Sequence, residues 1–142
     1  MMKNMQIKSY TTLPEEARAI RETVFVDEQG FKEEFDEADR TATHFVLFDG
    51  EKPIATCRIL TTEEEGTFFI GRIAVLKEYR GQHLGKTIVN AAEDYARERD
   101  GKKIRLHAQC RAVPFYEKIG YESLGEFDCE EGCPHVWMRK IL

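Results

Sequence analysis

No window of the sequence approaches the roughly 18 consecutive apolar residues that a membrane-spanning helix needs. The opening residues Met-Met-Lys-Asn-Met-Gln-Ile contain no continuous apolar stretch of the kind that signals export. No run rich in lysine or arginine occurs, and the 142 residues carry a net charge of −5, which argues against a nucleic-acid-binding surface. These absences predict a cytoplasmic protein whose partners are neither membranes nor nucleic acids.

Cysteine is scarce, with four residues at Cys57, Cys110, Cys129 and Cys133. In a reducing compartment these are expected to be free thiols. Cys129, Cys133 and His135 form a C-x3-C-x-H cluster that invites a zinc interpretation, with Cys110 as a conceivable fourth ligand, but no second paired motif accompanies it. Nothing near Cys110 supplies the base that a nucleophilic thiol needs. We therefore expect no metal here and interpret the cluster as a turn between two late strands.

Neither common nucleotide-binding loop is present. There is no G-x-G-x-x-G, and Gly81 and Gly85 are four residues apart where the P-loop pattern requires five, although Lys86-Thr87 follows. The stretch around these glycines nevertheless reads as a strand, a polar turn and the start of an amphipathic helix. A helix N-terminus has unpaired N–H groups and a partial positive charge, so such a turn, flanked by Arg80, is suited to phosphate oxygens.

The remaining pattern predicts one α+β domain, since 142 residues with 42% hydrophobic and 33% charged content are typical of a globular chain. Asp49-Gly50 predicts a hairpin, and a helix between two strands predicts that those strands are parallel and adjacent or nearly so. The expected strands cover residues 6–10, 43–48, 54–60, 67–76, 104–108, 121–127 and 135–141. The expected helices run from about 14 to 30, from 84 to 99 and from 114 to 119.

Residues 31–40 are rich in acids, with five carboxylates and no clear periodicity. Such a run is usually a solvated loop. Its expected place between the first helix and the sheet allows a second interpretation, in which the segment Glu33 to Asp39 attracts a cationic amine. Both interpretations remain open from the sequence.

Two motifs together resemble those of the GNAT superfamily of N-acetyltransferases. The segment from Arg80 to Gly85 resembles the coenzyme A pyrophosphate loop [Q/R]-x-x-G-x-[G/A], with His83 at the position of the first glycine. The segment Phe115-Tyr116-Glu117-Lys118-Ile119-Gly120-Tyr121 resembles the second signature, F-Y-x-x-x-G-[F/Y]. The chain is most similar to the ElaA-like and YjcF-like branch, through Arg21-x-x-Val24-Phe25-Val26-x-Glu28-Gln29, His44, Ile70-Gly71-Arg72, Ala108-Gln109 and Pro134-His135-Val136-x-Met138.

The resemblance implies a single GNAT-like domain over residues 1–142, with a mixed, mostly antiparallel sheet, a parallel βαβ unit and flanking helices. It implies acetyl-CoA as the acyl-donor cosubstrate and Tyr116 beside the thioester, as a hydrogen-bond donor to the leaving thiolate. Coenzyme A contacts are implied for Ile73, Ala74, Val75, Arg80, Gly81, Gln82, His83, Leu84, Gly85, Lys86, Gln109 and Phe115.

The implied acceptor is a primary amine of a small molecule or a peptide. Such an amine, with a pKa near 10.4, is deprotonated in only about one molecule in 2,500 at pH 7, so desolvation or a base must assist. The candidate bases are Glu28, Glu37, His44, His107 and His135. The residues expected to bind the acceptor are Glu28, Glu37, Asp39 and His135. A homodimer is left open.

Two alternatives remain. The N-terminal half, with Arg21-x-x-Val24-Phe25 and the acidic run from Asp36 to Asp39, is also similar to acyltransferases of the autoinducer-synthase type. A non-catalytic acyl-CoA-binding module, in which Tyr116 only packs, is an alternative of a different class. Release of free CoA thiol in the presence of amines distinguishes an enzyme from a binder.

Overall fold

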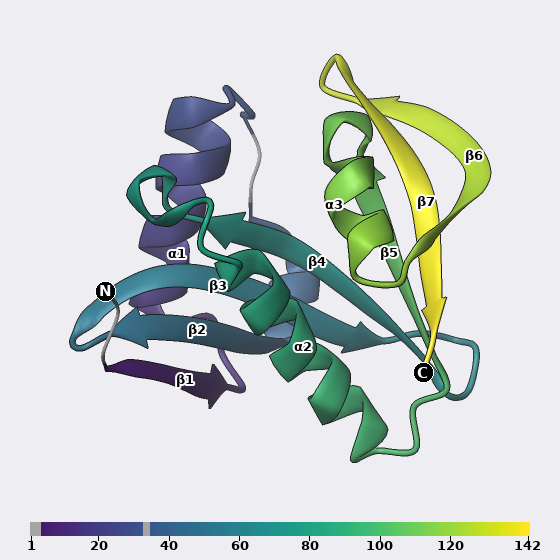
Figure 1. Cartoon of the computed structure of the whole chain (residues 1–142), viewed down its shortest axis with the longest axis horizontal. Coiled ribbons are helices and arrows are strands. Elements are labelled where there is room, and N and C mark those ends of the chain that lie inside the picture. Colours follow the sequence, from purple (N-terminus) through teal and green to yellow (C-terminus); the bar gives the residue numbers. More distant parts are fainter. Residues whose placement is uncertain (1–3, 33–34) are drawn as a thin grey trace.

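The computed structural model describes residues 4–32 and 35–142, which form a seven-stranded sheet flanked by helices (Figure 1). The strands form one sheet in the order β1-β2-β3-β4-β5-β7-β6. They are β1 (Met5–Tyr10), β2 (Thr43–Asp49), β3 (Lys52–Thr61), β4 (Thr67–Val75), β5 (Lys103–Gln109), β6 (Glu122–Glu130) and β7 (Cys133–Ile141). The helices are α1 (Glu15–Arg21), α2 (Leu84–Arg97) and α3 (Val113–Lys118), with the shorter helical segments η1 (Glu22–Glu28), η2 (Glu37–Arg40), η3 (Lys77–Tyr79) and η4 (Cys110–Ala112).

The sheet is mixed. Strands β1 to β4 are antiparallel neighbours, β4 and β5 are parallel, and β7 is antiparallel to both β5 and β6. The expected α+β class, the parallel unit around α2 and the final antiparallel pair are therefore confirmed. The last strand lies between β5 and β6, a position that the sequence pattern did not specify.

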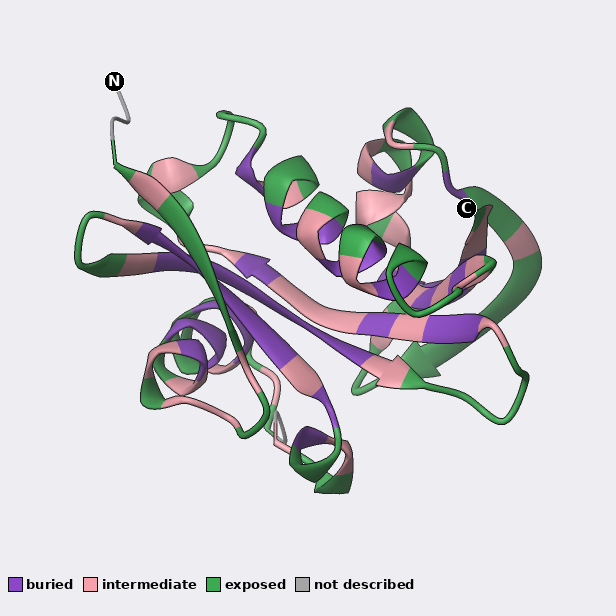
Figure 2. Cartoon of the chain, turned by 90° about the horizontal axis from the view of Figure 1, so that it is seen from below, coloured by how far each residue is buried: buried purple, intermediate pink, exposed green. Residues whose placement is uncertain are grey.

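Helices cover both faces of the sheet (Figure 2). On one face Ile88, Val89 and Ala92 of α2 pack in a buried cluster with Phe45 and Leu47 of β2. On the other face, residues of α1 and η1 pack against the alternate residues of β2 and against Ala74. A strand that is covered on both sides buries every residue, which explains why β2 reads as a continuous apolar run.

The first helix changes its geometry part of the way along. It begins after Pro14 without a side-chain cap. From Glu22 to Glu28 it continues as a π-helix, in which the amide of Gln29 donates to the carbonyl of Val24, five residues earlier, at 3.1 Å. Such segments are rare and occur frequently at functional sites. Here the π-helix ends at Glu28, next to the cavity described below.

Within the described ranges, none of the helices combines the length and the apolar character needed to traverse a bilayer.

Candidate active site

The centre of the sheet opens where two parallel strands separate. β4 and β5 pair only over Thr67–Phe69 and Lys103–Arg105, and they diverge beyond this point (Figure 1). A bulge in β4 adds to the opening, because Arg72 has a left-handed backbone (φ 53°) between the residues that pair with Thr56 and Arg58. Among the described residues, the second half of β4 thus has no strand partner on its β5 side. A cavity of about 810 Å³ lies against this edge.

The N-terminus of α2 presents the positive end of a helix dipole. Leu84, Gly85, Lys86 and Thr87 form its first turn, which contains no acid. Its first amides have no acceptor inside the helix, and the helix dipole is positive there. His83, the residue before the helix, has φ 61° and ψ 22°, which is the left-handed conformation that a glycine readily adopts. Histidine at the expected glycine position therefore still gives a turn into the helix.

Arg80 is engaged by two neighbours. Its Nη1 and Nη2 donate to the two carboxylate oxygens of Glu28 at 2.5 and 2.8 Å, and its Nε donates to the carbonyl of Val75 at 3.0 Å. The hydrogen bond from Arg80 lowers the pKa of Glu28, and nearby cations act in the same direction. The carboxylate of Glu28 therefore lies against the loop that was expected to hold phosphate, and not with the other residues expected to bind an amine.

Short helix α3 packs directly on the start of α2. A Cβ added to Gly85 would lie 2.9 Å from Cζ of Phe115, so this position is confined by the aromatic ring. Tyr116 packs edge-on against the rings of Phe115 and Tyr121, with centroids 5.0 and 6.0 Å away, and it lines the cavity. Burial raises the pKa of the Tyr116 phenol well above its ordinary value. The hydroxyl is thus protonated throughout the neutral range and suited to donate a hydrogen bond.

The far wall of the cavity is polar and is built from β5, β6 and β7. His107 and His135 lie on it with ring centroids 4.7 Å apart, and Trp137 stacks on His107 at 4.6 Å. Nε2 of His107 lies 2.6 Å from Oδ1 of Asp128, and Nδ1 of His135 lies 2.8 Å from the carbonyl oxygen of Cys133.

The acids of this wall were not among the sequence candidates, because the side chains that face the cavity are set by a bulge in β6. The register between β6 and β7 shifts between Ser123 and Phe127, where Gly125 has φ 73°. Asp128 and Glu130 follow this bulge and line the cavity. Asp128 and Glu130 are two residues apart, so on one strand they share a face, and this spacing was the available sequence signal. Which face lies toward the cavity depends on the register with β7, which the sequence does not reveal.

Gln109 connects the cavity to the first helix. Its Nε2 donates to Oε1 of Gln29 at 2.8 Å, and its Oε1 accepts a hydrogen bond from Nε of Arg111 at 2.7 Å. All three side chains line the cavity. The amide of Gln109 is therefore positioned at the mouth between β4 and β5.

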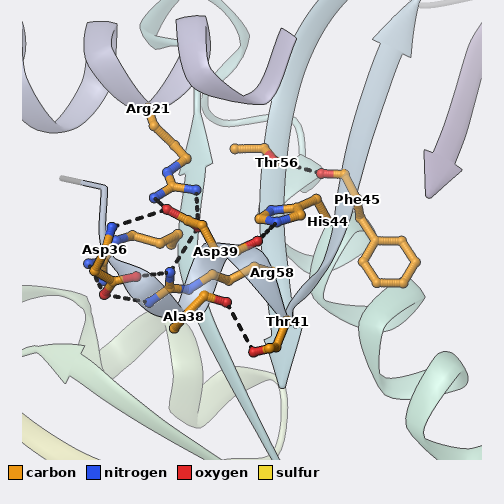
Figure 3. Close-up of polar contacts among 10 residues, drawn as sticks. Arg21, Asp36, Ala38, Asp39, Thr41, His44, Phe45, Thr56 and Arg58 are labelled. Carbon is orange, nitrogen blue, oxygen red and sulfur yellow. Dashed lines mark hydrogen bonds and ion pairs between the residues drawn. The ribbon is translucent and has the colours of Figure 1, made fainter. Parts of the chain in front are cut away.

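Much of the acidic segment is held in an ion-pair network (Figure 3). Asp39 is buried, with Arg21 donating to both of its oxygens at 2.8 and 3.0 Å and Arg58 donating to one of them at 2.9 Å. Burial alone would raise the pKa of Asp39, but the hydrogen bonds and charges of Arg21 and Arg58 lower it to about 2. Arg58 also pairs with Asp36. Asp39 is therefore not available to a cationic ligand.

The other candidates of this region also lie apart from the cavity wall. Glu37 is exposed and its carboxylate lies 3.5 Å from Arg40. His44 is buried with its Nε2 at 2.9 Å from the carbonyl oxygen of Asp39, and burial lowers its pKa. Glu33 and Glu34 lie outside the described residues. Of the expected bases, His107 and His135 alone line the cavity.

The arrangement places three chemical functions near one another: the N-terminus of α2 lies against α3 at Phe115, and Tyr116 of α3 and the edge of β4 line the cavity. The α2 terminus suits an anion, the open edge of β4 suits an extended amide chain, and the cavity holds a phenol donor opposite two imidazoles. An acyl donor with phosphate and amide groups thus fits along one side, and a nucleophile with a removable proton fits on the other.

Comparisons with known proteins agree with this geometry. The acetyltransferase (GNAT) domain family matches residues 10–142. The uncharacterized N-acetyltransferase YjcF of Bacillus subtilis is 40% identical over 124 residues, which cover 85% of this chain and 87% of the relative.

Two solved structures share the fold. Escherichia coli ElaA superposes with a TM-score of 0.86 at 24% identity, over 96% of this chain and 99% of that one. A Bacillus subtilis acetyltransferase in complex with CoA superposes with a TM-score of 0.74 at 17% identity, over 98% of this chain and 99% of that one. The two relatives named for the branch, YjcF and ElaA, are those to which the sequence motifs pointed.

Proposed function

The chain belongs to the GNAT acetyltransferase family and is an acyltransferase, and from this premise we propose that it transfers an acetyl group from acetyl-CoA to a primary amine of a small molecule or a peptide. The observation that carries the proposal is the separation of β4 from β5 after three residue pairs, beside a cavity of about 810 Å³. The open strand edge, the α2 terminus and Tyr116 all adjoin that separation.

Coenzyme A is proposed to lie along the open edge of β4. The backbone groups of Ile73 and Ala74 would pair with the pantetheine amides, while the carbonyl of Val75 already accepts from Arg80. The amides from Gly81 to Lys86 would receive the pyrophosphate, with Leu84 and Gln82 contributing backbone groups. The related fold that was solved in complex with CoA supports this use of the architecture.

The acceptor amine is proposed to enter from the polar wall. Because the carbonyl of Cys133 can only accept, Nδ1 of His135 carries the proton and Nε2 has a free lone pair on the cavity side. His135, directly or through a water molecule, would take the proton of the ammonium group. The carboxylates of Asp128 and Glu130 give the wall the negative charge that favours a cationic acceptor.

The transfer then follows from these positions. The amine lone pair attacks the thioester carbon, the new C–N bond forms and the C–S bond breaks. The leaving sulfur receives a hydrogen bond from the Tyr116 hydroxyl, and the second proton of the nitrogen ends on that sulfur. Outright transfer from a phenol of raised pKa to a thiolate of ordinary pKa is uphill by more than about 2 kcal/mol, so Tyr116 acts mainly as a donor.

The autoinducer-synthase alternative loses its residue-level support. Arg21 and Asp39, which suggested it, pair with each other below the surface, and Asp36 pairs with Arg58. These residues thus have structural partners, and no observation at the cavity favours that reaction.

The test is release of CoA thiol from acetyl-CoA with a panel of small amines and peptides, repeated with longer acyl chains. Amine-dependent thiol release, with acetylated product seen by mass spectrometry, supports the proposal. Binding of acetyl-CoA by calorimetry with no thiol release for any amine would identify the non-catalytic binder instead. Arg80→Ala with unchanged acetyl-CoA affinity would remove Arg80 from the site.

Two finer points belong to the same proposal. A cytoplasmic location is supported by four free cysteines, of which Cys129 is exposed.

A homodimer is supported by the edge strand β6, where the side chain of Phe127 is 69% exposed. Light scattering of the purified wild-type protein and of Phe127→Ser measures the oligomeric state, and a monomeric wild-type protein would refute the homodimer.

A further inference from the structure

The polar wall of the cavity contains a cluster of three potential metal ligands. His107, Glu130 and His135 each offer one donor atom, and these atoms lie within 4.8 Å of one another. They come from three adjacent strands, β5, β6 and β7, so the sheet itself holds their backbones at fixed spacing. His135 is buried, His107 is half-buried, and Glu130 lies at the exposed rim.

The hydrogen bonds around the two rings determine which nitrogen atoms are free to coordinate. The carbonyl of Cys133 holds the proton of His135 on Nδ1, and the carboxylate of Asp128 holds the proton of His107 on Nε2. Metal-binding histidines usually donate their second ring N–H to a carboxylate or a backbone carbonyl, which fixes the tautomer and the ring orientation. Both histidines here have such a partner.

The two free nitrogens converge on one carboxylate oxygen. Oε2 of Glu130 lies 3.6 Å from Nε2 of His135 and 3.9 Å from Nδ1 of His107. These separations exceed a hydrogen bond but approach the spacing of about 3.4 Å between ligands that surround a tetrahedral ion at 2.0–2.1 Å. Three lone-pair donors facing one point repel one another unless a proton or a metal cation lies between them.

We propose that His107, Glu130 and His135 bind a divalent transition-metal ion such as Zn²⁺, with the fourth position open to the cavity. The set of two histidines and one carboxylate with an open position suits zinc and its neighbours in the first transition row. The ion shares only His135 with the cysteine cluster of the sequence, because the thiols of Cys129 and Cys133 are not part of this group.

A bound ion has a consequence for catalysis, and this consequence rests on the proposed function. The ion would occupy the lone pair of His135 and offset the negative charge of Asp128 and Glu130, so Zn²⁺ should inhibit acetylation of a cationic amine competitively. Binding of the ion itself requires no turnover. Failure of the enzymatic proposal and failure of the metal proposal are therefore separate results.

The experiment is calorimetric titration of ZnCl₂ into chelator-treated full-length protein that carries Cys129→Ser and Cys133→Ser. One saturable site per chain is expected. His107→Ala and His135→Ala should each weaken it by more than the about 10- to 100-fold expected for Asp128→Asn, which removes only an orienting carboxylate. His83→Ala, a histidine on the distant loop before α2, is the matched control and should leave the affinity unchanged.

Cobalt provides a readout of the ligand set. Co²⁺ bound to nitrogen and oxygen donors should give visible d–d bands without the charge-transfer band of a thiolate, in the wild-type protein as in the cysteine variant. Circular dichroism of each variant confirms that it is folded. Three results would each overturn the proposal: no saturable binding, an affinity in folded His107→Ala or His135→Ala equal to that of the protein with both histidines, or loss of binding on removal of the thiols.

Discussion

At the scale of single residues, burial distinguishes between two roles for the hydroxyl of Tyr116, proton donor or hydrogen-bond donor. An exposed phenol near its ordinary pKa can transfer a proton to a thiolate at moderate cost, whereas the raised pKa of buried Tyr116 makes this transfer less favourable. The same burial strengthens a hydrogen bond to developing negative charge, because the local dielectric is low. We therefore expect Tyr116 to stabilise the leaving sulfur without losing its proton early.

Replacement of Tyr116 by phenylalanine tests this role. A donor aimed at developing charge contributes about 2–4 kcal/mol, so Tyr116→Phe should lower kcat and kcat/KM together by roughly 30- to 1,000-fold. The affinity for acetyl-CoA should stay nearly constant, because the ring still packs against Phe115 and Tyr121. Single-turnover measurements avoid masking by slow product release.

Tyr121→Phe is the matched control for this substitution. Tyr121 is also a buried tyrosine, but its hydroxyl donates to Glu93 at 2.7 Å and is not part of the cavity lining. Its loss should lower the free energy of unfolding and leave the chemical step unchanged. A chemical step in Tyr116→Phe within a factor of about two of wild type would remove Tyr116 from catalysis.

Glu28 presents a second residue-scale question, because its carboxylate binds the arginine expected at the phosphate loop. If Glu28 competes with the pyrophosphate for Arg80, Glu28→Gln should tighten CoA binding. The pair is substantially exposed, so the gain should be at most about 1 kcal/mol, or about fivefold in Kd, and it should shrink as salt is added.

Calorimetry with CoA measures this effect, and Glu78→Gln is the control. Glu78 acts on Arg80 by charge without a hydrogen bond, so the control changes the net charge equally and keeps the ion pair. Weaker CoA binding in Glu28→Gln than in Glu78→Gln would mean that Glu28 positions Arg80 for the ligand and does not compete with it.

At the scale of elements, the structure agrees with the sequence where one signal dominates. The alternating strands, the Asp49-Gly50 turn and the amphipathic α2 each follow from a local pattern, and the helix between β4 and β5 fixed their parallel pairing. The position of β7 between β5 and β6 cannot be predicted from a local pattern, because it depends on which strand pairs with the free edge of β5. The π-helix of η1 could not be predicted either, because one wider turn changes the spacing of the apolar residues too little to be recognised in the sequence.

The candidate site residues also separate into those predicted from a local motif and those that depend on the tertiary structure. The loop from Arg80 to Lys86 and the helix bearing Tyr116 are contiguous motifs, so the sequence alone offers them as candidates. Asp128 and Glu130 were missed because a bulge at Gly125 decides which side chains of β6 face His107. Asp39 was interpreted as a surface acid because its partner Arg58 lies 19 residues later in the sequence, and no local pattern predicts their hydrogen bond.

The turn into α2 gives a prediction for an element boundary. His83 has φ 61°, a conformation that costs a non-glycine residue about 1 kcal/mol, so His83→Gly should leave stability equal or raise it by up to this amount. His83→Val should destabilise, because a β-branched residue tolerates this backbone poorly. Urea unfolding measures both effects.

Gln82→Gly is the matched control for the turn, since Gln82 is the neighbouring exposed residue and does not have a positive φ. There the added glycine should lower stability through chain entropy alone. Equal losses in His83→Gly and Gln82→Gly would show that the left-handed turn carries no strain.

At the scale of the whole molecule, one ion-pair network ties the N-terminal half together. Asp39 of η2 receives hydrogen bonds from Arg21 of α1 and from Arg58 of β3, so it connects a helix, a loop segment and the sheet (Figure 3). Arg72, at the β4 bulge, pairs with Asp36 of the same network. The charges that hold the fold therefore adjoin the opened strand that forms the site.

Because folding lowers the pKa of Asp39, the network should make the free energy of unfolding depend on pH. A carboxyl whose pKa falls from its ordinary value of 3.8 to about 2 on folding stabilises the protein above pH 3.8 and loses that contribution as the pH falls toward 2. The difference corresponds to about 2 kcal/mol. Direct titration of the Asp39 carboxyl by NMR in wild-type protein is expected to give a midpoint well below that of an exposed aspartate.

Asp39→Asn should remove this acid-dependent part of the unfolding free energy. It should also cost about 3–5 kcal/mol at neutral pH, because Arg21 and Arg58 are left buried with one charge partner fewer. Urea unfolding between about pH 7 and pH 2.5 measures both quantities, and Glu37→Gln, on the exposed face of η2, is the control that should retain the wild-type profile. If Asp39→Asn keeps the wild-type slope between about pH 4 and pH 2.5, the acid sensitivity originates in other carboxyls and the network does not set the stability of this half of the molecule.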